Sequence, residues 1–310
     1  MKKLSFLILL ISLSASFSQT PELIPPIGHS AGVISIDTSP DGKFILTGAE
    51  DRFPILWDRK GRVVKAYEGP QSKVSSVDFS PDGKKVLAST NSGKTYVWDL
   101  EGRLMVVLPG MYTDPVKSFS RFLPDGKRIA VGAGDKIRLY DLNGNSLAEF
   151  QSIKWAINDM AVSPDGNYLA VISSSGEVGM YTPYGEEVFR IQAHTYKRFI
   201  VSSIDFSPNG ERLLTAGWGD SFFRLWDLNG QSIGSINAHE QGTSSAYFSH
   251  DGQKIISCGA GGMAKTWTIN GELINSYDID KGVFVDEVVF SHDDNSIIAH
   301  LSKVGVVNGI

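Results

Sequence analysis

A four-residue turn motif recurs seven times along the chain and limits the folds that the chain can adopt. Its copies, which read Ser-Pro-Asp-Gly or a variant of it, lie at Ser39–Gly42, Ser80–Gly83, Leu123–Gly126, Ser163–Gly166, Ser207–Gly210, Ser249–Gly252 and Ser291–Asp294. The second motif residue falls at positions 40, 81, 124, 164, 208, 250 and 292, which gives a mean spacing of 42 residues. A fixed period of this length indicates stacked structural repeats.

Each repeat also holds a second turn, typified by Trp98–Gly102, Tyr140–Gly144 and Trp226–Gly230. Short apolar runs separate the turns, and 32 Gly and 13 Pro among 310 residues agree with many tight connections. In the sixth repeat we expect strands over Ile233–Ile236, Ser245–Phe248, Lys254–Ser257 and Ala264–Thr268, which leaves no room for a helix. Four short strands in a repeat of about 40 to 45 residues are typical of one propeller blade.

The second turns resemble those of the WD-repeat β-propeller family. The name-giving Trp-Asp pair is present at Trp57-Asp58, Trp98-Asp99 and Trp226-Asp227. Other repeats keep half of the pair or neither half, as in Tyr140-Asp141, Trp267-Thr268 and Tyr181-Thr182. The resemblance covers residues 22–310. We therefore expect one all-β domain over residues 19–310, a seven-bladed β-propeller of four-stranded antiparallel blades.

The two ends of the chain predict how such a ring closes. The last repeat supplies strands near Val285–Phe290, Ser296–His300 and Val304–Val307, and no outer strand follows them. Glu22–Ile27 precedes the first inner strand, Val33–Asp37, at the place of an outer strand. Prolines 25 and 26 suit an edge, where a missing N–H costs little. We expect this N-terminal strand to close the ring.

Residues 1–18 have the pattern of a cleaved signal peptide. Lys2 and Lys3 precede an apolar run from Leu4 to Leu13, and the small residues around Ser18 allow a cut before Gln19. The apolar stretch is shorter than the roughly 20 residues of a membrane-spanning helix. We expect a periplasmic or secreted protein that is not inserted in the membrane after cleavage.

The family resemblance implies a buried hydrogen-bonded set in the best-formed repeats. The positions that match are His29, Thr47, Asp51 and Trp57 in the first repeat, and His194, Thr215, Asp220 and Trp226 in the fifth. The sixth repeat has His239, Ser257 and Trp267, but Gly261 replaces the Asp. Although these sets look like Ser-His-Asp triads, we interpret them as structural networks that fix the packing of the blade.

Composition and motifs argue against several other functions. A net charge of −5 at pH 7, with no basic cluster, argues against a nucleic-acid partner. The chain has no zinc-protease motif, nucleophile elbow or phosphate-binding loop. Cys258 is the only cysteine and reads as a small core residue. We therefore expect no catalytic residue, no metal and no cofactor.

One face of the predicted propeller is rich in aromatic and cationic residues. The inter-blade loops and the turns on the same face hold Phe53, Tyr112, Trp155, Tyr196, Lys197, Arg198, Phe199, Trp218 and Phe284. Aromatic residues and Arg are enriched at interface hot spots. We expect these residues to bind a protein or peptide, so that the chain acts as a non-catalytic scaffold.

The alternative is an exported propeller hydrolase or lyase that acts on a small sugar-like or lactone substrate, because a fold does not fix a function. Clustered acids or histidines at the channel mouth would favour the enzyme, whereas aromatic residues and scattered cations would favour binding. The sequence leaves the partner and the oligomeric state open.

Overall fold

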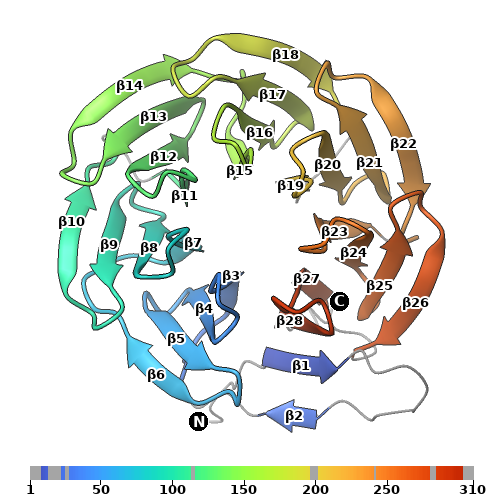
Figure 1. The fold of residues 1–310 in the computed structure, drawn as a ribbon, viewed down its shortest axis with the longest axis horizontal. Coiled ribbons are helices and arrows are strands. Elements are labelled where there is room, and N and C mark those ends of the chain that lie inside the picture. The colour runs from blue at the N-terminus through green and yellow to red at the C-terminus, as the bar shows by residue number, and fades with distance from the viewer. Residues whose placement is uncertain are drawn as a thin grey trace, which may run out of the picture.

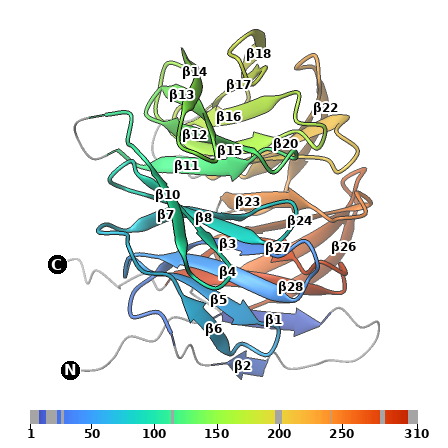
Figure 2. The ribbon, with the colours of Figure 1, turned by 60° about the vertical axis from the view of Figure 1, so that its left-hand side comes forward.

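The structure is a computed structural model that describes residues 8–12, 22–24, 28–112, 116–195, 202–240, 242–279 and 284–302. Its regular elements within these ranges are all β-strands. No helix long and apolar enough to cross a membrane occurs in the described part of the chain. The strands form four-stranded antiparallel sheets set in a ring around a central axis (Figures 1 and 2). The all-β class and the four-stranded antiparallel blade are thus confirmed.

Six sheets are blades made of four consecutive strands, with the first strand innermost. Blade one contains β3 (Val33–Thr38), β4 (Phe44–Ala49), β5 (Pro54–Asp58) and β6 (Val63–Ala66). Blade two contains β7 (Val74–Phe79), β8 (Lys85–Thr90), β9 (Thr95–Asp99) and β10 (Leu104–Leu108). Blade three contains β11 (Ser118–Phe122), β12 (Arg128–Ala133), β13 (Lys136–Asp141) and β14 (Ser146–Gln151).

Blades four to six repeat this order. Blade four contains β15 (Ile157–Val162), β16 (Leu169–Ser173), β17 (Glu177–Tyr181) and β18 (Glu187–Gln192). Blade five contains β19 (Ser202–Phe206), β20 (Arg212–Gly217), β21 (Phe222–Asp227) and β22 (Ser232–Asn237). Blade six contains β23 (Thr243–Phe248), β24 (Lys254–Gly259), β25 (Met263–Thr268) and β26 (Leu273–Asp278).

The remaining sheet is composite, because it joins segments from both ends of the chain. It contains β1 (Ile8–Ser12), β2 (Glu22–Ile24), β27 (Phe284–Phe290) and β28 (Ser296–Ser302). Their order is β2-β1-β28-β27, and β1 pairs with β28 from Ile8↔His300 to Ser12↔Ser296. This composite sheet lies between blades six and one (Figure 1).

The prediction of seven blades closed by one N-terminal strand is therefore wrong. The structure has six blades of consecutive strands, and two N-terminal strands enter the composite sheet. Counted from the channel, the third strand of this sheet is Ile8–Ser12, which belongs to the segment predicted to be a signal peptide. A short apolar run gives the same sequence pattern in a signal peptide and in a strand, so the sequence alone does not separate the two. The predicted strand Val304–Val307 lies outside the described residues.

The recurrent Ser-Pro-Asp-Gly turn has a repeated hydrogen-bond pattern. In the first copy the Ser39 hydroxyl donates to Asp41 at 2.8 Å and accepts the amide of Phe44 at 2.9 Å. The Gly42 amide donates to the Ser39 carbonyl at 2.8 Å, and its positive φ of 68° favours glycine. Each motif residue thus has its own role in reversing the chain between a first and a second strand.

Adjacent inner strands are joined by side chains that face the channel. The Asp37 carboxylate accepts the Phe79 amide of the next blade at 2.7 Å, and Asp78 accepts the Phe122 amide at 2.7 Å. Asp205 makes the matching contact with Phe248 at 2.9 Å. Away from the channel, apolar residues pack between blades, as Leu56 of blade one does in a cluster with residues of blade two. Polar contacts therefore line the axis, whereas the apolar core lies between the sheets.

Candidate functional site

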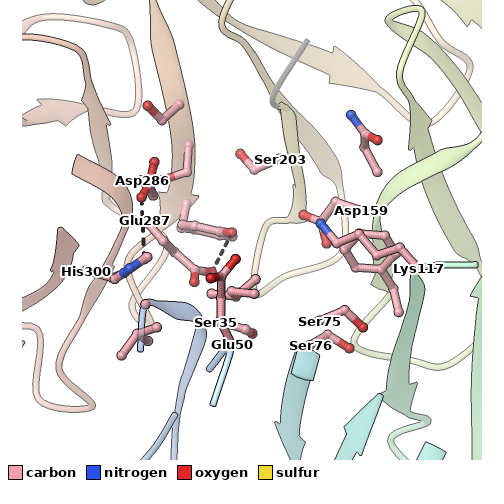
Figure 3. Close-up of a pocket in the computed structure, with 18 of the residues that line it drawn as sticks. Ser35, Glu50, Ser75, Ser76, Lys117, Asp159, Ser203, Asp286, Glu287 and His300 are labelled. Carbon is pink, nitrogen blue, oxygen red and sulfur yellow. Dashed lines mark hydrogen bonds and ion pairs between the residues drawn. The ribbon is translucent and has the colours of Figure 1, made fainter. Parts of the chain in front are cut away.

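A pocket of ≈460 Å³ opens at the end of the channel where the inter-blade loops enter the inner strands. We call it the mouth pocket. Among its titratable lining residues, Lys117 and Asp159 lie on one side and Asp286, Glu287 and His300 on the other (Figure 3). A pocket of this size with convergent polar groups is a default candidate for a binding site.

Two carboxylates of the mouth pocket, the buried Asp159 and the half-buried Glu287, are held by neighbouring blades. Asp159 accepts the amides of Met160 at 2.8 Å and Ile204 at 3.1 Å, and it pairs with Arg121 at 3.3 Å. Burial raises the pKa of Asp159, and the charge of Arg121 opposes that shift. These contacts position strands, so they account for this carboxylate without a ligand.

Glu287 is held in the same way. It accepts the hydroxyl of Tyr247 at 3.0 Å and the amide of Ile36 at 3.1 Å. Burial, together with the charge of Asp159, raises the pKa of Glu287 to about 7. The carboxyl group of Glu287 therefore ionises near neutral pH.

Lys117 is a cation of the mouth pocket that takes part in none of these contacts. Its side chain is exposed, and among the described residues no carboxylate lies within ion-pair distance of its ammonium. The ammonium lies 4.5 Å from the centre of the Phe119 ring. Desolvation by the channel walls lowers the pKa of Lys117, and the charges of Asp159 and Glu287 oppose that shift.

Two buried side chains of the mouth pocket have polar atoms without a hydrogen-bond partner in the described structure. They are Ser244, 2% exposed, and His300, 3% exposed. The nearest charged neighbour of His300 is Asp286, whose Oδ2 lies 4.0 Å from Nδ1. Burial lowers the pKa of His300 to about 3, so the ring is neutral at physiological pH. Buried polar groups without partners are rare in folded proteins, and here both face a pocket.

A second pocket of ≈480 Å³ opens at the other end of the channel, among the Ser-Pro-Asp-Gly turns. Its lining includes Asp37, Asp78 and Asp205, which join the blades. Burial raises the pKa of Asp37 to about 6 and that of Asp205 to about 7. The two pockets share Arg121, Tyr247 and Glu287, which therefore lie between them. Because its acids bind neighbouring strands, we assign this pocket a structural role.

None of the predicted binding residues that the structure describes lines the mouth pocket. Trp155, in the loop between β14 and β15, is 54% exposed, and Phe53 is 40% exposed. Trp218 and Phe284 are half-buried, and their rings contact each other in a tilted arrangement with centroids 5.3 Å apart. Tyr112 donates its hydroxyl to Asp135. Four further predicted residues lie outside the described part of the chain: Tyr196, Lys197, Arg198 and Phe199.

The family-type sets in blades one and five form continuous hydrogen-bonded chains. In blade one, His29 contacts Asp51 at 3.0 Å and Thr47 at 2.7 Å, and the Trp57 indole donates to Thr47 at 2.7 Å. Burial alone would raise the pKa of Asp51, but the hydrogen bond and charge of His29 outweigh it and lower the pKa. All polar atoms of this set have partners inside the blade.

Blade five has the same arrangement with one addition. His194 lies 3.0 Å from Asp220 and 2.9 Å from Thr215, which accepts the Trp226 indole at 3.0 Å. Arg224 donates to Asp220 at 2.6 Å. In blade six, His239 contacts Ser257 at 2.9 Å and Trp267 donates to the same hydroxyl at 2.9 Å. Cys258 is buried, and burial raises the pKa of its thiol.

Sequence reasoning missed the residues that line the mouth pocket. The signal in the sequence that could have revealed two of them is a change in residue type at one repeat position. This position lies two residues before the channel-facing Asp of the inner strand. Ser35, Ser76 and Ser203 occupy this position in blades one, two and five, whereas Asp159 and Glu287 replace the Ser in blade four and the composite sheet. Aligning the seven inner strands would have shown these substitutions. Within the described residues, no cluster of His, Cys, Asp and Glu suits a metal ion.

Comparisons with known proteins match this architecture. A family model for the WD domain, G-beta repeat, matches residues 21–58, 61–99, 185–227 and 230–268, just over half of the chain. The chain is 32% identical over 138 residues to the uncharacterised WD repeat-containing protein sll1491 of Synechocystis, with 43% of this chain and 38% of that protein covered.

Two further relatives are eukaryotic. The 66 kDa stress protein of Physarum polycephalum is 28% identical over 151 residues, which are 47% of this chain and 25% of that protein. The COMPASS component SWD3 of Saccharomyces cerevisiae is 28% identical over 145 residues, which are 46% and 44% of the two chains. The matched region therefore spans less than half the length of each of these relatives.

Proposed function

The chain belongs to the WD domain, G-beta repeat family, and from this premise we propose that it is a non-catalytic scaffold that binds a protein or peptide segment at the mouth pocket and the loops around it. WD-repeat propellers typically act as protein-interaction scaffolds. The proposal includes export through the predicted signal peptide, residues 1–18, and cleavage there would remove β1 from the composite sheet.

The observation that supports the proposal most is the composition of the mouth pocket and its rim. The pocket holds buried polar groups without partners, and an exposed Trp155 lies in the loop that leads to its lining residues Asn158 and Asp159. An exposed aromatic ring beside unsatisfied polar groups matches the anatomy of a peptide site, in which a ring supplies contact area and polar groups supply direction.

The enzyme alternative has one observation in its favour, since the fold brings Asp159, Glu287 and His300 to the mouth pocket. Acids clustered at the mouth were the feature expected of a hydrolase or lyase. However, the carboxylates of Asp159 and Glu287 bond to amides of neighbouring blades and to Arg121 or Tyr247. Because they already hold the scaffold together, we favour binding over catalysis.

Peptide binding to matched aromatic variants tests the proposal. The wild-type protein, Trp155→Ala and Tyr184→Ala are compared on one array of immobilised random peptides. Tyr184 is 64% exposed in the turn between β17 and β18, on the opposite face, and serves as the control. Loss of a hot-spot ring costs about 2 kcal/mol, roughly thirtyfold in affinity. We expect that loss in Trp155→Ala alone. Equal losses in both variants, or binding by neither variant nor wild type, would contradict the proposal.

A further inference from the structure

The charges of the mouth pocket are unequally satisfied. Arg121 pairs with Asp159 at 3.3 Å, and the pocket residue Glu50 pairs with Lys73 at 2.6 Å. Glu287 bonds to Tyr247 and to the Ile36 amide. Lys117 has no such partner among the described residues and contacts only an aromatic ring. An unpaired ammonium at the mouth of a pocket is available to a carboxylate from outside.

The two buried groups of the pocket that have no hydrogen-bond partner, His300 and Ser244, need a different kind of partner. The neutral ring of His300 can donate one hydrogen bond and accept another, and the Ser244 hydroxyl can do both. Peptide amides offer a donor and an acceptor on each residue. A ligand that carries a carboxylate on a peptide backbone therefore supplies partners to both sides of the pocket that Figure 3 shows.

Resting on the proposed function, we infer that the mouth pocket selects acidic peptide segments, with Lys117 binding the carboxylate and His300 and Ser244 binding polar atoms of the peptide. The carboxylate belongs either to an Asp or Glu side chain or to a free peptide C-terminus, since both present the same group. Lys117 is then the residue that determines specificity.

The test uses immobilised ten-residue peptides in matched versions. Each peptide that binds the wild-type protein is made with Glu or Gln at its acidic positions, and with a free or an amidated C-terminus. The full chain is tested as wild type, Lys117→Met, Lys117→Arg and Lys127→Met. Lys127 lies on the same blade, in the turn between β11 and β12 at the other end of the channel, and controls for the general loss of a positive charge.

We expect wild type, Lys117→Arg and Lys127→Met to bind the acidic versions about tenfold more tightly than the neutral ones, as befits a charge-assisted contact. Lys117→Met should bind both versions equally. Comparison of the Glu and Gln peptides, and of the free and amidated C-termini, shows which carboxylate binds Lys117. Bound peptides with no acidic preference, or a preference that survives in Lys117→Met, would overturn the inference and leave the scaffold proposal intact. Absence of any bound peptide would overturn both.

Discussion

His29, His194 and His300 are almost fully buried, but their surroundings differ. In blades one and five, both nitrogens of His29 and His194 have a side-chain partner within 3.1 Å. In the composite sheet, His300 has no hydrogen-bond partner in the described structure, and its ring faces the mouth pocket. A buried histidine side chain thus occurs with both ring nitrogens hydrogen-bonded within a blade in the first two cases, and with neither ring nitrogen hydrogen-bonded in the third.

This difference separates residues that hold the fold from residues that are available to a ligand. A satisfied buried network fixes one packing arrangement, and removal of one member leaves the others unpaired. A buried group that has no partner contributes no such bond to stability. We therefore expect substitutions in the two regions to affect different measurements.

The largest expected effect on stability is in blade five. Asp220→Ala removes a partner of both His194 and Arg224, so it should lower the free energy of unfolding by about 1–3 kcal/mol. Asp227→Ala, at the last residue of β21, is the control and should cost less. Thermal melts of the two variants check this. If the two proteins melt together, the blade-five network does not stabilise the fold.

His300→Leu should have the opposite profile. The ring has no hydrogen bond to lose and a leucine has a similar volume, so the free energy of unfolding should change by less than about 1 kcal/mol. Peptide binding should fall severalfold, because the pocket loses a polar group. The matched variant His29→Leu should melt at a lower temperature and still bind. A His300→Leu protein that is strongly destabilised would remove the distinction between the two regions.

The smallest expected effect is a difference in pH dependence. Glu287 and Asp205 have pKa values raised by burial from 4.5 and 3.8 to about 7, so they bind protons more tightly when folded. Their contribution to stability is complete below about pH 4 and is lost as the pH rises to about 7. Burial lowers the pKa of His194, so its contribution is present above pH 6.5 and is lost as the pH falls.

Glu287→Gln should therefore flatten the fall in melting temperature between pH 4.5 and pH 7. Melting curves of the variant and the wild type at half-unit pH intervals measure this slope. An unchanged slope would mean that Glu287 titrates at its ordinary pKa and is not desolvated in the channel.

The blades were predictable because their signals are local. Ser39, Asp41 and Gly42 each have a defined role in one turn, and the pattern repeats along the chain. The sequence set His29, Thr47, Asp51 and Trp57 could be matched to the family pattern for the same reason. Strand β1 of the composite sheet could not be predicted, because its pairing with β28 joins the two ends of the chain and leaves no repeat signal.

The sequence predicted which face of the propeller binds a partner, but it did not predict the mouth pocket on that face. Trp155 and Phe284 mark that face, but the pocket itself is lined by residues in or directly before the inner strands, such as Glu287 and Lys117. Whether such a residue pairs with a neighbour depends on contacts between blades that are about 40 residues or more apart in sequence. No local pattern reveals which side chains remain without a partner.

A crystal structure of the protein with its tightest-binding acidic peptide tests the central claim most directly. We predict that the peptide lies across the mouth pocket, with a carboxylate within hydrogen-bond distance of the Lys117 ammonium and polar atoms against His300 or Ser244. A peptide bound among the Ser-Pro-Asp-Gly turns or along the outer strands, with the mouth pocket empty, would contradict the account.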